Sequence, residues 1–337
     1  IKDEAPLDLT HATLHTLNPP RGTQWDDHLH HVAGIYGPNG SGKTNLLEAL
    51  RHVQSAIATL LPMGTNAMPY DVSKPTVYSV EFIHDGARYE YALSRNAEGI
   101  AGESLRVARK RWNTIYSRDK HGAVKGLKGL PHVNVNELVI TRASLMGDPQ
   151  VKPVRDALTT GVKVFRVGDP SMEDAYLHIA RHLLSRRLDT TALSTLAQVA
   201  DLGTTSIELC APQRPALSAR HAPADREDAE VALAKALPHI LEFQYGERTV
   251  PHAAFSASSG SIMWLALAIA AVDALTGGQV LVVDDLTASL HPDLGRVIID
   301  WFTSPTANQS GAQLIFTSHN IALMDIGRGP IRNRERI

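Results

Sequence analysis

The feature that most constrains this chain is a glycine-rich segment of eight residues, Gly37-Pro-Asn-Gly-Ser-Gly-Lys-Thr44. A short apolar run, His31 to Tyr36, precedes it, and a run with helical apolar spacing, Asn45 to Val53, follows it. Glycine adopts backbone angles that other residues avoid, so three glycines in eight residues allow a tight turn between a strand and a helix. The sequence therefore predicts a strand–loop–helix unit, which is typical of α/β folds.

The same segment matches the phosphate-binding pattern called the P-loop at every position. Its glycines let successive backbone N–H groups face a phosphate, and the start of the following helix adds a positive dipole. We expect Lys43 to reach the β- and γ-phosphates of a nucleotide and the Thr44 hydroxyl to coordinate Mg²⁺. The candidate nucleotide-binding residues are Gly37, Pro38, Asn39, Gly40, Ser41, Gly42, Lys43, Thr44 and Asn45.

Acidic residues stand where a P-loop needs a partner, at the end of an apolar strand, Leu281 to Asp284. We expect Asp284 to hold Mg²⁺ through water, and Asp285 to orient or deprotonate an attacking water. His319 follows a second apolar strand, Gln313 to Phe316, where it could hydrogen-bond the γ-phosphate. Taken alone, two acidic residues after a buried strand can simply be residues exposed to solvent, and a histidine at a strand end is often structural. The P-loop favours the functional interpretation.

The segments Asp284-Asp-Leu-Thr-Ala-Ser-Leu-His291-Pro292 and Phe316-Thr-Ser-His319 resemble the Walker B, D-loop and switch-histidine series of ABC-type ATPases. The Ala-Ser-Leu-His-Pro form is similar to the RecF, SMC and OLD group rather than to transporters, although no long heptad run for an SMC arm is present. In such proteins a signature helix precedes the Walker B strand. Here Ala257-Ser-Ser-Gly-Ser261 opens the apolar run Ile262 to Leu275.

The resemblance implies an ATPase with ATP and Mg²⁺ as cofactors, assembled as a homodimer or a higher even-numbered homo-oligomer. In the ABC arrangement, Ser258 of one protomer faces the γ-phosphate held by Lys43 of the other, which adds Ser258, Ser259 and Gly260 to the nucleotide-binding residues. The implied catalytic residues are Lys43, Asp285 and His319, and the implied metal ligands are Thr44 and Asp284.

Two motifs depart from the family pattern. Ser259 and Ser261 stand where transporters have Gly and Gln. Asp285 stands where the family usually has glutamate, which draws the carboxylate back by roughly 1.5 Å. A misplacement of about 1 Å can cost about 10²-fold in rate. Slow hydrolysis, or a switch held by ATP, therefore competes with ordinary turnover.

The fold class predicted is α/β: a P-loop ABC-ATPase core with a mixed sheet, an antiparallel β lobe and a helical lobe. Strands alternating with helices predict a parallel sheet. Period-two patterning from Thr76, with a tight turn at Asp85-Gly86, predicts the β lobe. The expected divisions are 1–160 for the N-terminal half of the core with the P-loop and β lobe, 161–254 for the helical lobe and an insert, and 255–337 for the remaining half of the core.

Several element boundaries are also predicted. Strands are expected at Ile100 to Arg111 and Thr114 to Ser117, and a helix from Asp174 to Leu188. Proline-rich residues from Ala211 to Asp228 predict a mobile linker, and Pro238 is expected to end the next helix.

The formal net charge of −2 gives no chain-wide field that would attract nucleic acid. Residues Arg106 to Lys128 are a local exception, with eight basic residues against one acidic residue. Trp112 and Tyr116 are interleaved, as base stacking would require. The segment therefore predicts either nucleic-acid contact or the solvated face of a β-hairpin. The basic residues are Arg106, Arg109, Lys110, Arg111, Arg118, Lys120, Lys125 and Lys128.

Composition indicates a cytoplasmic protein without membrane contact. The single cysteine, Cys210, excludes an internal disulfide and a cysteine metal site, which fits a reducing compartment. The most apolar run, Ile262 to Leu275, is interrupted by Trp264 and Asp273, so no membrane span is expected. The chain begins with Ile1 and without a basic-then-apolar leader, so we expect further residues upstream.

The resemblance suggests a stand-alone bacterial ATPase of the phage-defence type, which senses infection or DNA and controls a separate effector such as a nuclease. A RecF-like DNA-repair ATPase acting directly on DNA is the first alternative, and the basic segment would serve it. The second is an ATP-dependent scaffold that hydrolyses poorly, because of Asp285. The long interval between Lys43 and Ser258 excludes a compact transporter subunit.

Overall fold

The computed structural model describes residues 6–11, 16–38, 40–59, 74–167, 172–185, 187–200, 202–209, 226–245, 248–250, 258–288, 290–320 and 323. Most of the expected linker, as far as residue 225, lies outside these ranges, as does Cys210. A short 3-10 helix, η1 (Trp25–His28), precedes the core strands.

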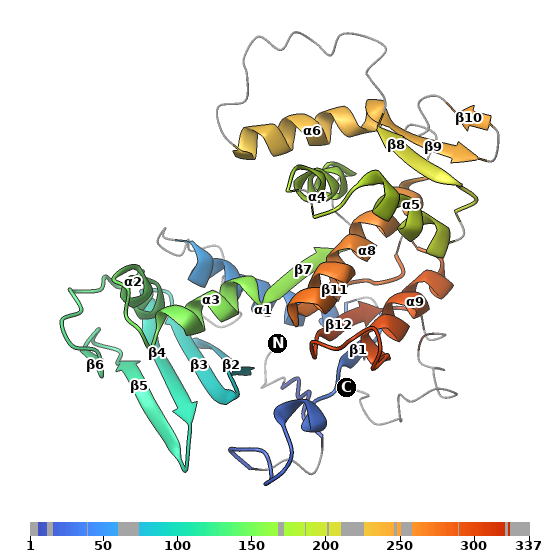
Figure 1. Cartoon of the computed structure of the whole chain (residues 1–337). Helices are drawn as coiled ribbons and strands as arrows, with labels where there is room; N and C mark the ends of the chain where they lie inside the picture. Colours follow the sequence, from blue (N-terminus) through green and yellow to red (C-terminus); the bar gives the residue numbers. More distant parts are fainter. Residues whose placement is uncertain are drawn as a thin grey trace.

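A parallel sheet of four strands forms the core (Figure 1). In spatial order the strands are β1 (Val32–Tyr36), β12 (Gln313–Ser318), β11 (Val280–Asp284) and β7 (Val162–Arg166). Because neighbours run parallel, Tyr36 pairs with Ser318 and Val283 with Phe316, and the carboxyl ends of β1, β12 and β11 meet at one edge. The expected parallel sheet is confirmed, while antiparallel strands, among the described residues, form sheets of their own. β7, which follows the predicted boundary at residue 160, belongs to this core sheet.

Helices bury both faces of the core sheet, because alternate strand residues point to opposite sides. On one face, Ile35, Val282 and Ile315 pack with Leu47 of α1 (Lys43–Ala58). On the other, Leu281, Val283, Leu314 and Phe316 pack with α8 (Ser259–Gly277) and α9 (Pro292–Thr303).

Helix α8 is apolar all round because it is enclosed on all sides by protein. Every residue from Ile262 to Ala271 is at most 4% exposed. Among the described residues, α8 is the one helix with the length and composition of a membrane span, and 67% of its apolar window is buried inside the protein.

The β lobe lies to one side of the core (Figure 1, left). Its antiparallel strands are β2 (Thr76–His84), β3 (Ala87–Asn96), β4 (Gly99–Ala108), β5 (Trp112–Arg118) and β6 (Val124–Lys125). The predicted turn joins β2 and β3, with Asp85 and Gly86 at φ values of 47° and 71°, as a tight hairpin requires. Helices α2 (Val139–Leu145) and α3 (Lys152–Thr160) pack on this sheet and on Ile57 of α1. The lobe is therefore attached directly to the helix that follows the P-loop.

The helical lobe lies against α8 (Figure 1, top). It contains α4 (Met172–Leu184), α5 (Thr190–Val199) and α6 (Arg226–Ile240), with the small antiparallel sheet β8 (Ser206–Leu209), β9 (Leu241–Tyr245) and β10 (Arg248–Val250). Two predicted helix ends are wrong. α4 stops before Leu188, because Asp189 caps the N-terminus of α5 by accepting a hydrogen bond from the Ala192 N–H. Pro238 lies inside α6, where it removes one N–H donor of a helix that continues for only two more residues.

Candidate functional site

Backbone conformation requires glycine at some positions of the P-loop, and lack of space for a side chain requires it at another. Gly40 and Gly42 have φ values of 79° and 94°, which side-chain-bearing residues rarely adopt. A Cβ on Gly37 would lie 2.7 Å from the Ser41 Oγ. Gly42 is the N-cap of α1, so the loop ends where the helix dipole begins. The loop is thus a backbone cradle of the kind that binds phosphate; Asn39 lies outside the described residues.

Lys43 points back into this cradle. Its side chain is 9% exposed, and its Nζ donates to the Gly37 carbonyl at 2.8 Å and the Pro38 carbonyl at 3.0 Å. The Nζ also lies 3.4 Å from the His319 Nδ1. The ammonium is therefore held among the loop's own carbonyls, close to the backbone that would bind phosphate.

Asp284 lies beside Thr44, as the sequence predicts for a pair of metal ligands. The Asp284 Oδ1 accepts from the Thr44 Oγ1 at 3.3 Å and from the Thr317 Oγ1 at 2.7 Å. Carboxylate and hydroxyl oxygens are the donors that Mg²⁺ prefers, and it is commonly bound by one or two carboxylates together with substrate phosphates. Groups of three or more metal-binding side chains do not occur in the described part of the chain. The donor set fits a magnesium ion that is shared with a nucleotide.

Asp285 and His319 lie next to each other at the same edge. The His319 Nε2 is 3.8 Å from the Asp285 Oδ2. The Nδ1 of the same ring lies 3.4 Å from the Lys43 ammonium, so His319 lies between the P-loop lysine and Asp285. The structure thus brings Lys43, Asp285 and His319 together, although they are far apart in the sequence.

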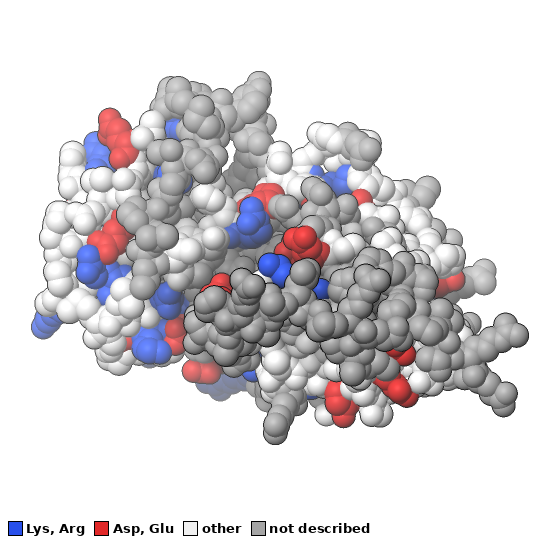
Figure 2. Space-filling model, turned by 90° about the horizontal axis from the view of Figure 1, so that it is seen from above, with Lys and Arg blue, Asp and Glu red and all other residues white. Residues whose placement is uncertain are grey.

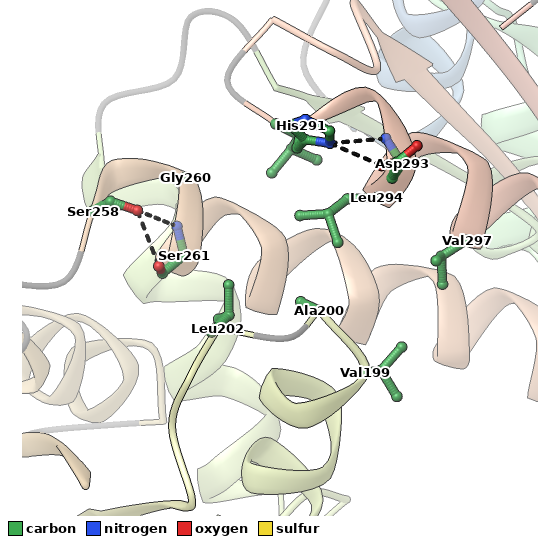
Figure 3. Close-up of a pocket in the computed structure, with 11 residues that line it drawn as sticks. Val199, Ala200, Leu202, Ser258, Gly260, Ser261, His291, Asp293, Leu294 and Val297 are labelled. Carbon is green, nitrogen blue, oxygen red and sulfur yellow. Dashed lines mark hydrogen bonds and ion pairs between the residues drawn. The ribbon is translucent and has the colours of Figure 1, made fainter. Parts of the chain in front are cut away.

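The predicted signature residues lie elsewhere in the chain. Ser258 caps α8, with its Oγ accepting from the Ser261 N–H at 3.1 Å (Figure 3). Ser258 and Ser259 are exposed, and Ser258 and Gly260 line a groove of about 530 Å³ between α5, α8 and α9. Among the described residues, no hydrogen bond or ion pair joins these residues to the P-loop. The signature serines are thus exposed at the start of α8.

Thr317 is a site residue that the sequence analysis missed. It is 1% exposed and contacts both acidic residues: its Oγ1 donates to the Asp284 carboxylate and accepts from the Asp285 N–H at 2.7 Å. A hydroxyl residue two positions before the switch histidine was visible in the sequence. Its importance depends on the β11–β12 register, which the sequence does not reveal.

The basic segment of the β lobe does not form one surface. Arg118 is 4% exposed and donates to the Asn134 and Glu137 carbonyls, and Arg106 is paired with Glu90. The expectation that Tyr116 could stack on a base is wrong, because it is fully buried with its hydroxyl bonded to a carboxylate.

The exposed basic residues of this segment include Arg109, Lys110 and Arg111 at the β4–β5 turn. Trp112 follows them and is half-buried, with the Arg106 guanidinium 5.0 Å from its ring centre. Elsewhere, on the face shown in Figure 2, basic and acidic side chains are interspersed. The turn is the part of the segment where exposed basic residues are consecutive; Lys120, Lys125 and Lys128 are exposed but are separated along the chain.

Comparison with known proteins gives a family. The model of a family described as "AAA domain, putative AbiEii toxin, Type IV TA system" matches residues 32–325, from β1 past His319. Among solved structures, the chain is similar to the recombination mediator protein RecF with ATP, of the RecFOR pathway. That likeness has 16% identity, 86% coverage of each chain and a TM-score of only 0.26. No curated protein matches. Because the family model covers most of the chain and includes the P-loop, both acidic residues and His319, the chain belongs to this family of P-loop ATPase domains.

Proposed function

We propose that this chain binds and hydrolyses ATP as an ABC-type ATPase that dimerises around MgATP. The observation that carries the proposal is the convergence of Lys43, Asp284, Asp285 and His319 at one edge of the parallel sheet. Motif residues that come from three separate segments gain their function only when the fold assembles them.

Each group then has a chemical role. Lys43 and the P-loop N–H groups offset the negative charge of the phosphates, and Thr44 and Asp284 would hold the metal. The bound metal ion would supply charge neutralisation at the phosphate oxygens. Asp285 orients the attacking water and accepts its proton, while His319, 3.8 Å from that carboxylate, contacts the γ-phosphate.

The signature residues support a shared site. Ser258 and Ser259 are exposed, and among the described residues no hydrogen bond joins them to their own P-loop, so we propose that a second copy brings them to the nucleotide. A two-fold axis would make both sites equivalent. We accordingly propose a homodimer, or a higher even-numbered assembly.

The family description names a putative toxin of a type IV toxin–antitoxin system. This description supports our proposal that the ATPase acts in the cytoplasm in anti-phage defence. That it senses infection and regulates a separate effector, such as a nuclease, is proposed from the resemblance of its motifs. Copurification of an effector with the MgATP-bound protein would support this role. A RecF-like repair ATPase and a poorly hydrolysing scaffold are the alternatives. If DNA alone raises the ATPase rate, without an effector, the repair ATPase is favoured. If the protein binds ATP but releases no phosphate, the scaffold is favoured.

The decisive test of the shared site mixes two inactive variants. Ser258→Arg blocks closure, and Lys43→Ala removes ATP binding, so each is expected to be inactive alone. In a mixed dimer one of the two sites regains both wild-type halves, and part of the ATPase activity returns. Ser259→Arg mixed with Ser258→Arg is the control, since it restores no site. A mixture that exchanges subunits yet stays inactive, together with Ser258→Arg hydrolysing at the wild-type rate, would exclude a shared site.

Direct nucleic-acid contact is a second candidate, favoured by the exposed turn Arg109 to Arg111 beside Trp112. Changing Arg109, Lys110 and Arg111 to Glu is expected to abolish any salt-sensitive DNA affinity, because each phosphate contact adds about 0.9 to the salt slope. Lys152→Glu, on an exposed residue of α3, serves as the control. Absence of DNA binding by the wild type at low salt would identify the turn as a solvated face only.

A further inference from the structure

We propose that Thr317 is a positioning residue that sets the geometry of both acidic groups, an inference that rests on the proposed ATPase function. Its Oγ1 lies between the Asp284 carboxylate and the Asp285 backbone, at 2.7 Å from each. The side chain is 1% exposed, so water does not compete for these bonds. No other hydroxyl among the described residues is recorded in contact with both.

The two hydrogen bonds of Thr317 have a fixed direction. The Asp285 N–H can only donate, so the Thr317 oxygen accepts from it, and the hydroxyl proton must then point to the Asp284 oxygen. Donation to an ionised carboxylate is stronger than a neutral hydrogen bond. Thr317 therefore fixes one oxygen of Asp284, the same Oδ1 that lies 3.3 Å from the Thr44 hydroxyl.

Thr317 also holds Asp285 in an uncommon backbone conformation. Asp285 has a φ of 55°, and the other described non-glycine residue with positive φ, Asp85, lies in a hairpin turn. The Asp285 N–H is bonded to the Thr317 hydroxyl, and the next N–H, of Leu286, is bonded to the Thr317 carbonyl at 2.9 Å. Both bonds span the residue that adopts the left-handed conformation.

This conformation gives a reason for aspartate at position 285. Asp and Asn tolerate the left-handed region better than longer side chains do. The turned backbone places the short Asp285 carboxylate 3.8 Å from His319. The short acid thus suits the backbone that Thr317 holds, and a longer acid would adopt this backbone less readily.

Removal of the hydroxyl tests the proposal. Thr317→Val keeps the shape of the side chain but leaves the Asp285 N–H without its partner. We expect kcat to fall by about 10- to 100-fold with a smaller change in KM for ATP, because small displacements of reacting groups have effects of this size. Thr317→Ser retains the hydroxyl and should restore most of the rate. Equal kcat for wild type, Thr317→Val and Thr317→Ser would overturn the proposal.

A binding measurement separates this inference from the ATPase proposal itself. Calorimetry with a non-hydrolysable ATP analogue gives the affinity with and without Mg²⁺. In the wild type, Mg²⁺ is expected to increase the affinity for the analogue. In Thr317→Val this increase should be at least about 3-fold smaller, equivalent to about 0.7 kcal/mol, while the affinity without Mg²⁺ is unchanged. Thr317→Ser should match the wild type in both measurements. If the wild type binds but hydrolyses nothing, the ATPase proposal fails and this difference still tests Thr317. If Thr317→Val does not fold, Thr317→Cys replaces it. Equal Mg²⁺-dependent affinity of the Thr317→Cys and Thr317→Ser variants would then overturn the inference.

Discussion

The ammonium of Lys43 shows how the site is balanced at the scale of single residues. It is nearly buried, and its hydrogen bonds go to two carbonyls of the loop that would receive the phosphates. Neutral carbonyls satisfy the donors but do not neutralise the charge. The hydrogen bond from Lys43 to an incoming phosphate would therefore be stronger than its bonds to the two carbonyls, because hydrogen bonds between ionised partners are the stronger ones.

Lys43→Ala should consequently lower the affinity for MgATP by at least about 100-fold, or about 2.7 kcal/mol. The free energy of unfolding should change little, because the two carbonyls released lie on an open loop where water can reach them. Calorimetric titration measures the affinity, and thermal melting measures the fold. Lys125→Ala, at an exposed position of the β lobe, is the matched control. Unchanged affinity in Lys43→Ala would reject the nucleotide site.

Site residues that belong to a local motif could be predicted from the sequence. The P-loop glycines, Lys43 and the acidic pair follow from chemistry that acts over a few adjacent positions. Thr317 and Tyr116 could not be predicted in the same way. The hydroxyl of Thr317 matters only through the neighbouring strand β11, and Tyr116 is buried in the core of the β lobe, where its hydroxyl donates to Glu103. Both properties come from strand pairing between distant segments.

At the scale of elements, a buried ionic junction fastens the helical lobe to the core. Asp273 of α8 accepts from Lys163 of β7 at 2.7 Å and from His182 of α4 at 2.8 Å. Burial alone would raise the pKa of Asp273, but the bonds from His182 and Lys163 outweigh it and hold the pKa well below its usual range. The other ring nitrogen of His182 lies 2.8 Å from the His178 carbonyl oxygen. Burial lowers the pKa of His178 to about 3, so that ring stays neutral.

Asp273→Asn should therefore lower the free energy of unfolding by about 2 kcal/mol at neutral pH, since a hydrogen bond to a charged group contributes about 1.5 to 3 kcal/mol. The pKa of Asp273 is lower in the folded state than in the unfolded chain. Its contribution is thus complete above about pH 4, the usual range of the group, and is lost as the pH falls. Urea unfolding between pH 7 and pH 3 measures both effects.

The difference between wild type and Asp273→Asn should accordingly be largest near pH 7 and shrink below about pH 4. Asp300→Asn, at an exposed position of α9, should change the stability by less than about 0.5 kcal/mol. A difference that stays constant down to pH 3 would mean that Asp273 is not held as an ion by its two partners.

Helices and strands whose apolar residues recur at a regular spacing could be predicted well from the sequence, but the residues at which they end could be predicted less well. The β2–β3 hairpin and the strands β11 and β12 follow from alternation and apolar runs. The end of α4 and the continuation of α6 through Pro238 did not follow, because packing against other elements decides how far a helix extends.

At the scale of the whole molecule, the β lobe is attached to the C-terminal end of α1, opposite the end that adjoins the P-loop. The Ile57 carbonyl accepts from the Thr141 hydroxyl at 3.2 Å and from the Arg155 Nε at 3.2 Å, and Arg155 also donates to the Ala58 carbonyl. Residues of α2 and α3 therefore satisfy carbonyls that the C-terminus of a helix leaves free. The β lobe is thus bonded to the same helix whose N-terminus ends the P-loop.

The association of two copies provides the last prediction, because it depends on the whole ATP-bound surface. Asp285→Asn should keep MgATP bound through Thr44 and Asp284, and Asn tolerates the left-handed backbone of position 285 as Asp does. It loses the charge that orients the attacking water, so hydrolysis should slow by at least about 100-fold. A ligand that binds the dimer more tightly than the monomer stabilises the dimer, so this variant should accumulate as a dimer in MgATP.

Light scattering with MgATP, MgADP and no nucleotide measures the accumulation. Asp285→Asn should be mainly dimeric in MgATP and revert with MgADP, whereas the wild type should form the dimer only while ATP lasts. Asp285→Asn combined with Lys43→Ala is the control, and it should stay monomeric because no nucleotide joins the two surfaces. If Asp285→Asn hydrolyses ATP at the wild-type rate, Asp285 does not orient the water. If it is inactive and binds MgATP yet remains monomeric, the nucleotide does not lie between two protomers, and the exposed signature at Ser258 must serve another contact.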